Sequence, residues 1–276
     1  MIARIARLTR AEFLKLSANP FLLVSLAVVG AAVLLAAVLQ PALRQQEETA
    51  WRTLNAALLF VYGFKVGLKI ATYVLIVFSS MLFAGEFDRG TIKNLLTRPI
   101  SRGDLFAAKC LVVAGLAAFL FAATLWMSLA YAFARGDAGP VWDRDQYYLV
   151  RSGAEMGEHA VRAVGMSLPS FLAAGFLGLL VSNWTESSGY SVAIALILFL
   201  VGDFVTDYLP PAGQQKVFLH YAPYALEKLQ SLAEGTNTRW DPDVVDRRLH
   251  LWVPAAYAAA FIPLAFGIFR ARNITS

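Results

Sequence analysis

Long apolar stretches separated by shorter polar ones are the main pattern along this chain. Six stretches are long enough to cross a hydrocarbon core of about 30 Å as helices, for which about 20 residues suffice. They cover residues 21–39, 66–84, 105–134, 161–181, 189–207 and 251–269. We therefore predict an all-α polytopic membrane protein with six transmembrane helices.

Composition supports a membrane protein with little soluble structure. Of the 276 residues, 58% are hydrophobic and only 16% are charged, whereas charged residues make up about 25% of a typical soluble domain. The mean hydropathy is +0.57. Because so little polar sequence lies between the apolar stretches, we expect residues 1–276 to form a single transmembrane domain.

The first 19 residues have the pattern of a basic amphipathic helix. Apolar side chains recur on one helical face, and the neighbouring face carries the bases Arg4, Arg7, Arg10 and Lys15. We predict an elbow helix over residues 1–19 that lies on the membrane surface and ends at Asn19-Pro20. A signal peptide is the competing interpretation. The apolar run that follows is too long for one and shows no small-x-small cleavage site, so we expect the segment to be retained.

The remaining polar segments are expected to be connections of different kinds. Residues 40–64 form a polar connection with one apolar patch, and residues 135–160 are predicted to be a solvated loop rich in acids. A tight turn at residues 182–188 joins the fourth and fifth spans. Residues 210–235 have a helical apolar pattern, and we expect them to form an outer, extracytoplasmic re-entrant segment interrupted at Pro223.

The segment of residues 83–109, between the second and third spans, mixes acids and bases more densely than a connection requires. From Thr91 onward, the run TIKNLLTR can form a short helix that ends before Pro99. Its apolar stripe would consist of Ile92, Leu95 and Leu96, with Lys93 on the opposite side. Such a helix at the membrane surface suits docking of a soluble partner. An ordinary solvated loop explains the same charges.

This segment resembles the first cytoplasmic loop of type-2 ATP-binding-cassette (ABC) exporter permeases. The matching residues are Glu86, Gly90-Thr91, Leu95-Leu96, Pro99, Ser101-Arg102 and Lys109. The order of elbow helix, spans and broken segment before the last span is similar over nearly the whole chain. The resemblance implies a coupling helix within residues 86–104 that docks on a separate cytoplasmic ABC ATPase. It also implies a dimer with a second permease copy, identical or different.

The resemblance assigns roles to ten residues of the coupling loop. Ile92, Leu95 and Leu96 would enter a groove on the ATPase, while Arg89, Lys93, Arg98 and Arg102 would set the register against its acidic rim. Glu86, Gly90 and Thr91 would shape the entry to the coupling helix. ATP and Mg would be bound by the partner ATPase, and we expect this chain to bind no cofactor itself.

A second group of candidates lies near the end of the fifth span. Asp203 and Asp207 are one helical turn apart, and acids within a membrane are functional candidates by default. Their place beside Pro210-Pro211 favours a water-exposed interface. The resemblance implies that the broken segment before the last span helps to close the outer end of the pathway. We therefore predict an outer gate or pathway formed by Asp203, Asp207, Phe218 and Tyr221.

Two lysines begin the second span. Lys65 and Lys69 are one turn apart, and they most simply extend their ammonium groups to the lipid headgroups. Attraction of an anionic substrate is the alternative. The net charge of +5 is likewise better explained by topology and anionic lipid than by nucleic acid.

The density of Lys and Arg in short loops favours an orientation with both termini in the cytoplasm, since cytoplasmic loops carry the excess of basic residues. The polar segment at residues 83–109 would then face the cytoplasm, as docking on an ATPase requires. We expect a multi-pass protein of the bacterial inner membrane.

The sequence offers no residues for chemistry of its own. It contains neither a P-loop nor the motifs H-E-x-x-H and G-x-S-x-G. Cys110 is the only cysteine, and the three histidines lie far apart, so we predict no catalytic residue and no metal site.

The resemblance implies that the chain is the permease subunit of an ATP-driven exporter. A membrane assembly or anchor protein and a secondary transporter are the alternatives. Secondary transport is weakened because the spans show no charges near mid-bilayer and no paired broken helices. The apolar spans favour a hydrophobic or amphipathic substrate.

Overall fold

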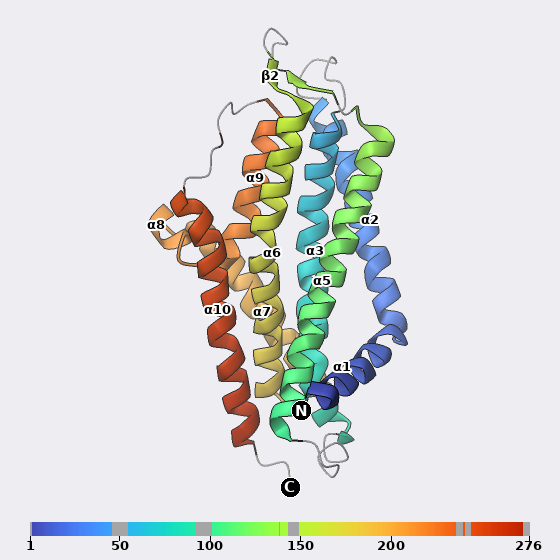
Figure 1. Ribbon diagram of the computed structural model, residues 1–276, viewed down its shortest axis with the longest axis vertical. Helices are drawn as coiled ribbons and strands as arrows, with labels where there is room; N and C mark the ends of the chain where they lie inside the picture. The colour runs from blue at the N-terminus through green and yellow to red at the C-terminus, as the bar shows by residue number, and fades with distance from the viewer. Residues whose placement is uncertain are drawn as a thin grey trace.

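The computed structural model describes residues 2–45, 55–91, 101–137, 139–142, 149–235, 240 and 244–272. Within these ranges the chain folds into a bundle of long helices (Figure 1). The six longest are α2 (Pro20–Gln45), α3 (Ala56–Asp88), α5 (Arg102–Arg135), α6 (Gly153–Trp184), α7 (Ser188–Tyr208) and α10 (Val244–Ala271). Each contains a stretch long and apolar enough to cross a membrane, which confirms the predicted all-α, six-span fold.

Helix α3 is the centre of the bundle. Helices α2, α5, α6, α7 and α9 (Tyr221–Ala233) all pack against it. Its sequence is mostly apolar, as expected of a helix surrounded by other helices, and Leu75, Ile76 and Phe83 are fully buried. The approach of α6 is especially close at Gly178, where a Cβ would lie 2.9 Å from the carbonyl oxygen of Ile76.

The two ends of the bundle differ in construction. Helix α1 (Ile2–Ser17) and the last turns of α10 lie at one end, at the bottom of Figure 1, which we call the terminal end. The opposite end, which we call the hairpin end, carries the antiparallel strands β1 (Val141–Trp142) and β2 (Leu149–Arg151).

The hairpin end corrects the prediction of a solvated loop over residues 135–160. Besides the strand pair, this range contains the first two turns of α6, which begins at Gly153 rather than at residue 161. A capping box explains the early start. The Ser152 hydroxyl accepts the Glu155 backbone N–H, and the Glu155 carboxylate accepts the Ser152 backbone N–H.

The predicted polar connection at residues 40–64 is also partly helical. Helix α2 continues to Gln45, and α3 begins at Ala56, ten residues before the predicted start of the span. The side chain of Asn55 caps α3 by accepting the Ala57 backbone N–H at 2.8 Å. The apolar patch after it is buried, including Leu59, Phe60 and Val61, so packing rather than lipid explains this hydrophobic stretch.

The segment after α7 is broken, but not where the sequence indicated. Helix α8 (Pro211–Gln214) and the 3-10 turn η1 (Phe218–His220) precede α9. Pro223 lies in the first turn of α9, where backbone N–H groups have no partner within the helix, so it does not interrupt the helix. The break falls at residues 215–217. Beyond it, Ala225, Leu226 and Leu229 are buried against the bundle, as their helical spacing predicts.

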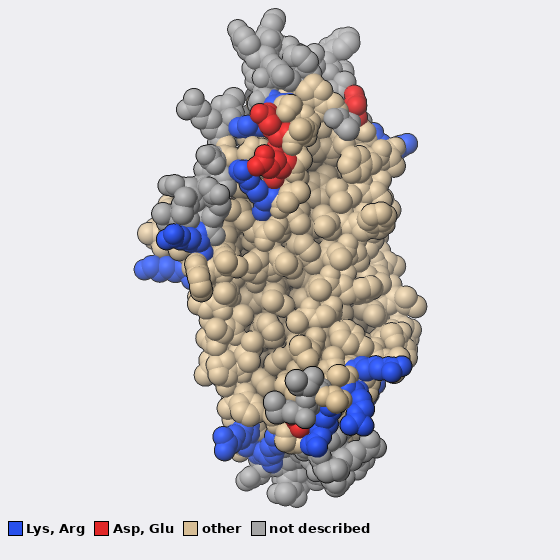
Figure 2. All heavy atoms as spheres, viewed as in Figure 1, with Lys and Arg blue, Asp and Glu red and all other residues tan. Residues whose placement is uncertain are grey.

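The outside of the bundle is apolar between charged ends. Figure 2 shows a broad band with no described Lys, Arg, Asp or Glu on the visible face, and charged residues above and below it. Helices α2, α7 and α10 are the least buried of the six. Their exposed side chains include Leu23, Leu35, Ile197, Phe204 and Leu264. A surface of this kind suits lipid or another apolar helix.

We predict that Gly178→Ala destabilises the bundle, because a methyl group there would press on the backbone of α3. The expected loss is about 1–3 kcal/mol, seen as a lower midpoint of thermal unfolding in detergent. Gly165→Ala is the matched control on the same helix, since nothing lies within 4 Å of its Cβ position. It should leave the midpoint unchanged or raise it, because alanine is the better helix former. Equal midpoints for the two variants would contradict the close packing.

Candidate functional site

A buried group of charges joins three helices at the terminal end. It consists of Glu12 and Lys15 on α1, Glu86 on α3 and Lys109 on α5, and we call it the Lys109 cluster. The side chain of Lys109 is fully buried. Its Nζ lies 3.0 Å from Glu86 Oε1 and 3.4 Å from Glu12 Oε2, and it donates a 2.7 Å hydrogen bond to the Leu82 carbonyl oxygen.

Lys15 completes the balance of charge. Its Nζ is 2.5 Å from Glu12 Oε1 and 3.5 Å from Glu86 Oε1, so two carboxylates face two ammonium groups. The three N–H donors of the Lys109 ammonium face three acceptors. A buried charge with this compensation is tolerated, whereas a buried charge that has lost its partner is strongly destabilising.

The charges also shift the titration of the two residues on α1. Burial of Glu12 acts to raise its pKa, but the ammonium groups of Lys109 and Lys15 outweigh burial and hold the pKa below its usual 4.5. Burial of Lys15 acts to lower its pKa, but Glu12 and Glu86 raise it above its usual 10.5. Both groups are therefore charged across the neutral range, and α1 is held on the bundle by full charges.

Further contacts hold α1 against the start of α5. Arg4 Nη1 lies 3.6 Å from the carboxylate of Asp104, which is itself nearly buried. The ring of Phe13 packs directly over Gly115, where a Cβ would clash with it at 2.3 Å. The predicted elbow segment is thus a helix fixed to the bundle by ionic and steric contacts.

The other helices are joined to each other at the same end. The Ser188 hydroxyl of α7 donates to Asp88 of α3 at 2.6 Å. Arg102 at the start of α5 donates to the carbonyl oxygens of Arg270 and Arg272, at 2.9 and 3.1 Å. Arg272 in turn donates to the Thr185 carbonyl oxygen at 3.0 Å. These bonds connect the ends of α3, α5, α6, α7 and α10.

Just before this end, side chains of neighbouring helices form hydrogen bonds with the backbone of α3. The Ser182 hydroxyl of α6 accepts the N–H groups of Phe83 and Ala84, at 2.8 and 3.0 Å. The Ser191 hydroxyl of α7 donates to the Ser80 carbonyl oxygen at 2.7 Å. Lys109 of α5 donates to the Leu82 carbonyl oxygen in the same stretch. Side chains of three helices therefore form hydrogen bonds with residues 80–84 of α3.

The predicted coupling residues divide into two sets. Glu86 lies in the Lys109 cluster, Arg89 caps the end of α3, and Gly90 and Thr91 follow the cap, with Gly90 in the left-handed region at a φ of +65°. Arg102 begins α5, after the cap formed by Ser101. The remaining five residues, Ile92, Lys93, Leu95, Leu96 and Arg98, lie outside the described residues.

Sequence reasoning missed the partners of the cluster. It placed Lys109 with the bases of the polar segment and Lys15 with those of the elbow helix, and it gave Glu12 no role. A signal was present, because Lys109 is followed by an apolar stretch in which a lysine needs a compensating charge, and Glu12 stands beside the apolar Phe13. Which of the acids along the chain would supply that charge could not be known without the fold.

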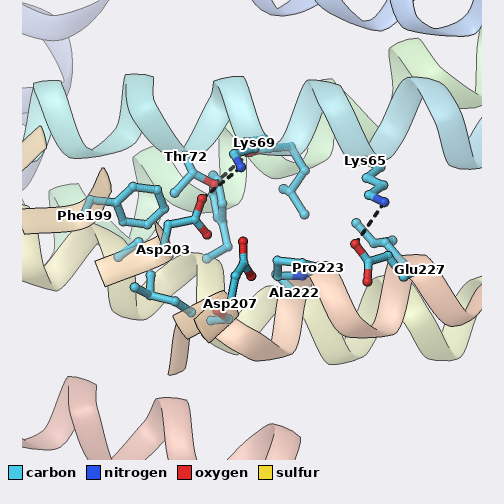
Figure 3. A pocket seen from close by; sticks show the side chains of 15 residues that line it. Lys65, Lys69, Thr72, Phe199, Asp203, Asp207, Ala222, Pro223 and Glu227 are labelled. Carbon is cyan, nitrogen blue, oxygen red and sulfur yellow. Dashed lines mark hydrogen bonds and ion pairs between the residues drawn. The ribbon is translucent and has the colours of Figure 1, made fainter. Parts of the chain in front are cut away.

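A second candidate site lies toward the hairpin end, between α3, α6, α7 and α9. It is a cavity of about 170 Å³, which we call the α7–α9 pocket (Figure 3). Asp203 and Asp207 of α7 and Lys65 and Lys69 of α3 line it, together with Glu227 of α9. Charged residues from three helices thus surround one cavity.

The lysines of this pocket correct the prediction that they reach the lipid headgroups. Lys69 Nζ is 2.9 Å from Asp203 Oδ2, and Lys65 Nζ is 3.1 Å from Glu227 Oε1. Both carboxylates come from segments far along the chain, so the sequence offered no sign of the pairing. The fold supplies each lysine with a carboxylate partner inside the bundle.

The predicted outer gate is only partly brought together. Asp203 and Asp207 line the pocket, whereas Phe218 and Tyr221 do not. Phe218 is buried against Tyr257 and its carbonyl oxygen accepts the Ser170 hydroxyl at 2.6 Å. Tyr221 is buried beside His250 and donates to the Gln215 carbonyl oxygen.

Six helices long and apolar enough to cross a membrane, tied together at one end by buried ion pairs, define a multi-pass membrane protein. The family model described as "ABC-2 family transporter protein" matches residues 8–202. The chain therefore belongs to the ABC-2 transporter family, whose members are the membrane permease components of ABC transporters, as the resemblance indicated. A search of the curated proteins finds no match.

We predict that Lys109→Met destabilises the protein by about 3–5 kcal/mol, because it leaves two buried carboxylates without their main counter-charge. Lys15→Met is the matched control. The Lys15 side chain is 58% exposed, so its ion pairs are screened and the expected loss is about 1 kcal/mol or less. Thermal unfolding in detergent compares the two variants, and equal losses would contradict the central place of Lys109.

Acidification should release α1. Because the folded-state pKa of Glu12 is lowered, its contribution is present above the unfolded-state value of about 4.5 and is lost as the pH falls through the folded-state value. Hydrogen exchange of α1 amides, corrected for intrinsic rates, should rise over that window. In Glu12→Gln the exchange should be faster at neutral pH and lack this acid transition. An unchanged transition in the variant would assign it to another group.

Proposed function

We propose that this chain is the permease subunit of an ATP-driven exporter and works as a dimer with separate ATPase subunits. The family supports the permease role. The Lys109 cluster is the observation that carries the coupling to an ATPase. It ties α1 to both helices that bracket residues 92–100, since α3 ends near Asp88 and α5 begins at Arg102. A displacement of this loop is transmitted directly to three helices.

The docking contact itself is assigned to residues 92–100. On the proposal, Leu95 and Leu96, with Ile92, enter a groove on the ATPase, and the neighbouring bases pair with acids at its rim. ATP and Mg belong to the ATPase, because catalysis there needs phosphate and metal ligands that this chain has no motif to provide. The second permease copy and membrane lipid cover the apolar outside of the bundle.

The charges at the terminal end support an orientation with this end in the cytoplasm. The described bases there include Arg4, Arg7, Arg10, Arg89 and Arg272, while the described acids are fewer, and Glu86 and Asp104 among them are paired with bases. Blue side chains gather at this end in Figure 2. Short basic segments stay on the cytoplasmic side of a membrane, which is the side where an ATPase would meet the loop.

We expect a stoichiometric P-loop ATPase to copurify with the tagged chain from its native host in mild detergent, and the complex to hydrolyse ATP. Replacing Leu95 and Leu96 by Asp should remove the ATPase or reduce its turnover by about tenfold or more, because two charges would enter an apolar contact.

Asn94→Asp is the matched control. It adds a carboxylate in the same segment, on the side of the predicted helix opposite the apolar stripe, and should leave copurification intact. If no ATPase copurifies and crosslinking in intact membranes captures none either, the chain is an assembly protein or a secondary transporter instead.

A further inference from the structure

We infer that the α7–α9 pocket binds an amphipathic amine, with the ammonium group on Asp207 and an apolar group in the cavity. The use of this pocket as the substrate site of the permease rests on the proposed exporter function. Binding of an amine to the pocket does not depend on that function.

The charges of the pocket favour a cation. Two ammonium groups, of Lys65 and Lys69, stand against three carboxylates, of Asp203, Asp207 and Glu227, so one negative charge is in excess. Asp203 and Glu227 are each paired with a lysine. Among the described residues Asp207 accepts no hydrogen bond and forms no ion pair. In Figure 3 its carboxylate extends into the space between Asp203 and Pro223.

An anion fits the same pocket poorly. The ammonium group of Lys69 lies 2.9 Å from Asp203, and that of Lys65 lies within 3.2 Å of both Glu227 and the Gln230 amide oxygen. An anionic ligand would add to the excess of negative charge in the pocket and would be repelled by three carboxylates. A cation meets Asp207 without breaking either pair.

The walls of the pocket are apolar and define the second half of the ligand. Leu68, Phe171 and Ala174 form one side and are nearly or fully buried, while Phe199, Leu219 and Leu226 form the other. The volume of about 170 Å³ is close to that of an engineered apolar cavity, about 150 Å³, that binds benzene. A ring or a short branched alkyl group therefore fits.

The ion pairs of the pocket join three helices. Asp203 and Asp207 are on α7, Glu227 is on α9, and both lysines are on α3. The two ion pairs therefore hold α7 and α9 to the central helix on either side of the cavity. An ammonium group placed at Asp207 meets the carboxylate that these pairs leave over, so it binds with α7 and α9 still held to α3.

Three matched probes test the inference: 4-phenylbutylamine, 4-phenylbutanol and 4-phenylbutyrate share one ring and linker and differ in the head group. Binding is measured by calorimetry on the purified chain in lipid nanodiscs, without ATP or ATPase. We expect the amine to bind about tenfold or more tightly than the alcohol and the acid, the difference that one charge-assisted hydrogen bond supplies.

Asp207→Asn should reduce amine affinity by about tenfold and leave the alcohol unaffected. Glu158→Gln is the matched control, because it removes one exposed carboxylate near the hairpin end of α6, outside the pocket. Since both variants are embedded in the same lipid, partitioning of the probes cancels in the comparison. Ala222→Phe, which fills the cavity, should abolish specific binding of both amine and alcohol.

Equal affinities for amine and acid, or an Asp207→Asn variant that binds the amine as well as the wild type, would overturn the inference. Either result leaves the exporter function standing, because copurification of the ATPase tests that function separately. Conversely, if no ATPase is found but the amine binds at Asp207, the pocket is confirmed as a binding site and its use in ATP-driven export is rejected.

Discussion

The ammonium group of Lys109 is the constraint on which the terminal end of the molecule depends. It is fully buried, and a lone charge in that position would cost several kcal/mol. The carboxylates of Glu12 and Glu86 remove this cost only if α1, α3 and α5 meet at one place and in one register. A single buried cation thereby fixes the position of a surface helix relative to two spans.

The fold followed from the sequence to the extent that it depends on local hydrophobicity. Six apolar stretches gave six helices, but α3 and α6 begin well before the stretches that lipid alone would require. Capping by Asn55 and Ser152 and burial of residues such as Phe60 extend them. Proline was misleading in the opposite sense, since Pro223 lies in the first turn of a helix that it was expected to break.

The sites were less predictable because they depend on partners distant in sequence. The loop between α3 and α5 stood out by its charge density, and Asp203 and Asp207 by their place at the end of a span. The pairing of Lys109 with Glu12, or of Lys69 with Asp203, joins residues about 100 or more positions apart. Such pairs are decided by packing of whole helices, which single-sequence patterns do not contain.

The length of α3 has a mechanical consequence. At about 1.5 Å per residue its 33 residues extend for roughly 50 Å, well beyond a hydrocarbon core of about 30 Å. A rigid rod of that length acts as a lever: a tilt of about 5° at one end moves the other by roughly 4 Å. The Lys109 cluster holds one end of α3, and the lysines of the α7–α9 pocket lie well along the same helix. A small rotation of α3 at the Lys109 cluster therefore displaces these lysines far enough to separate an ion pair.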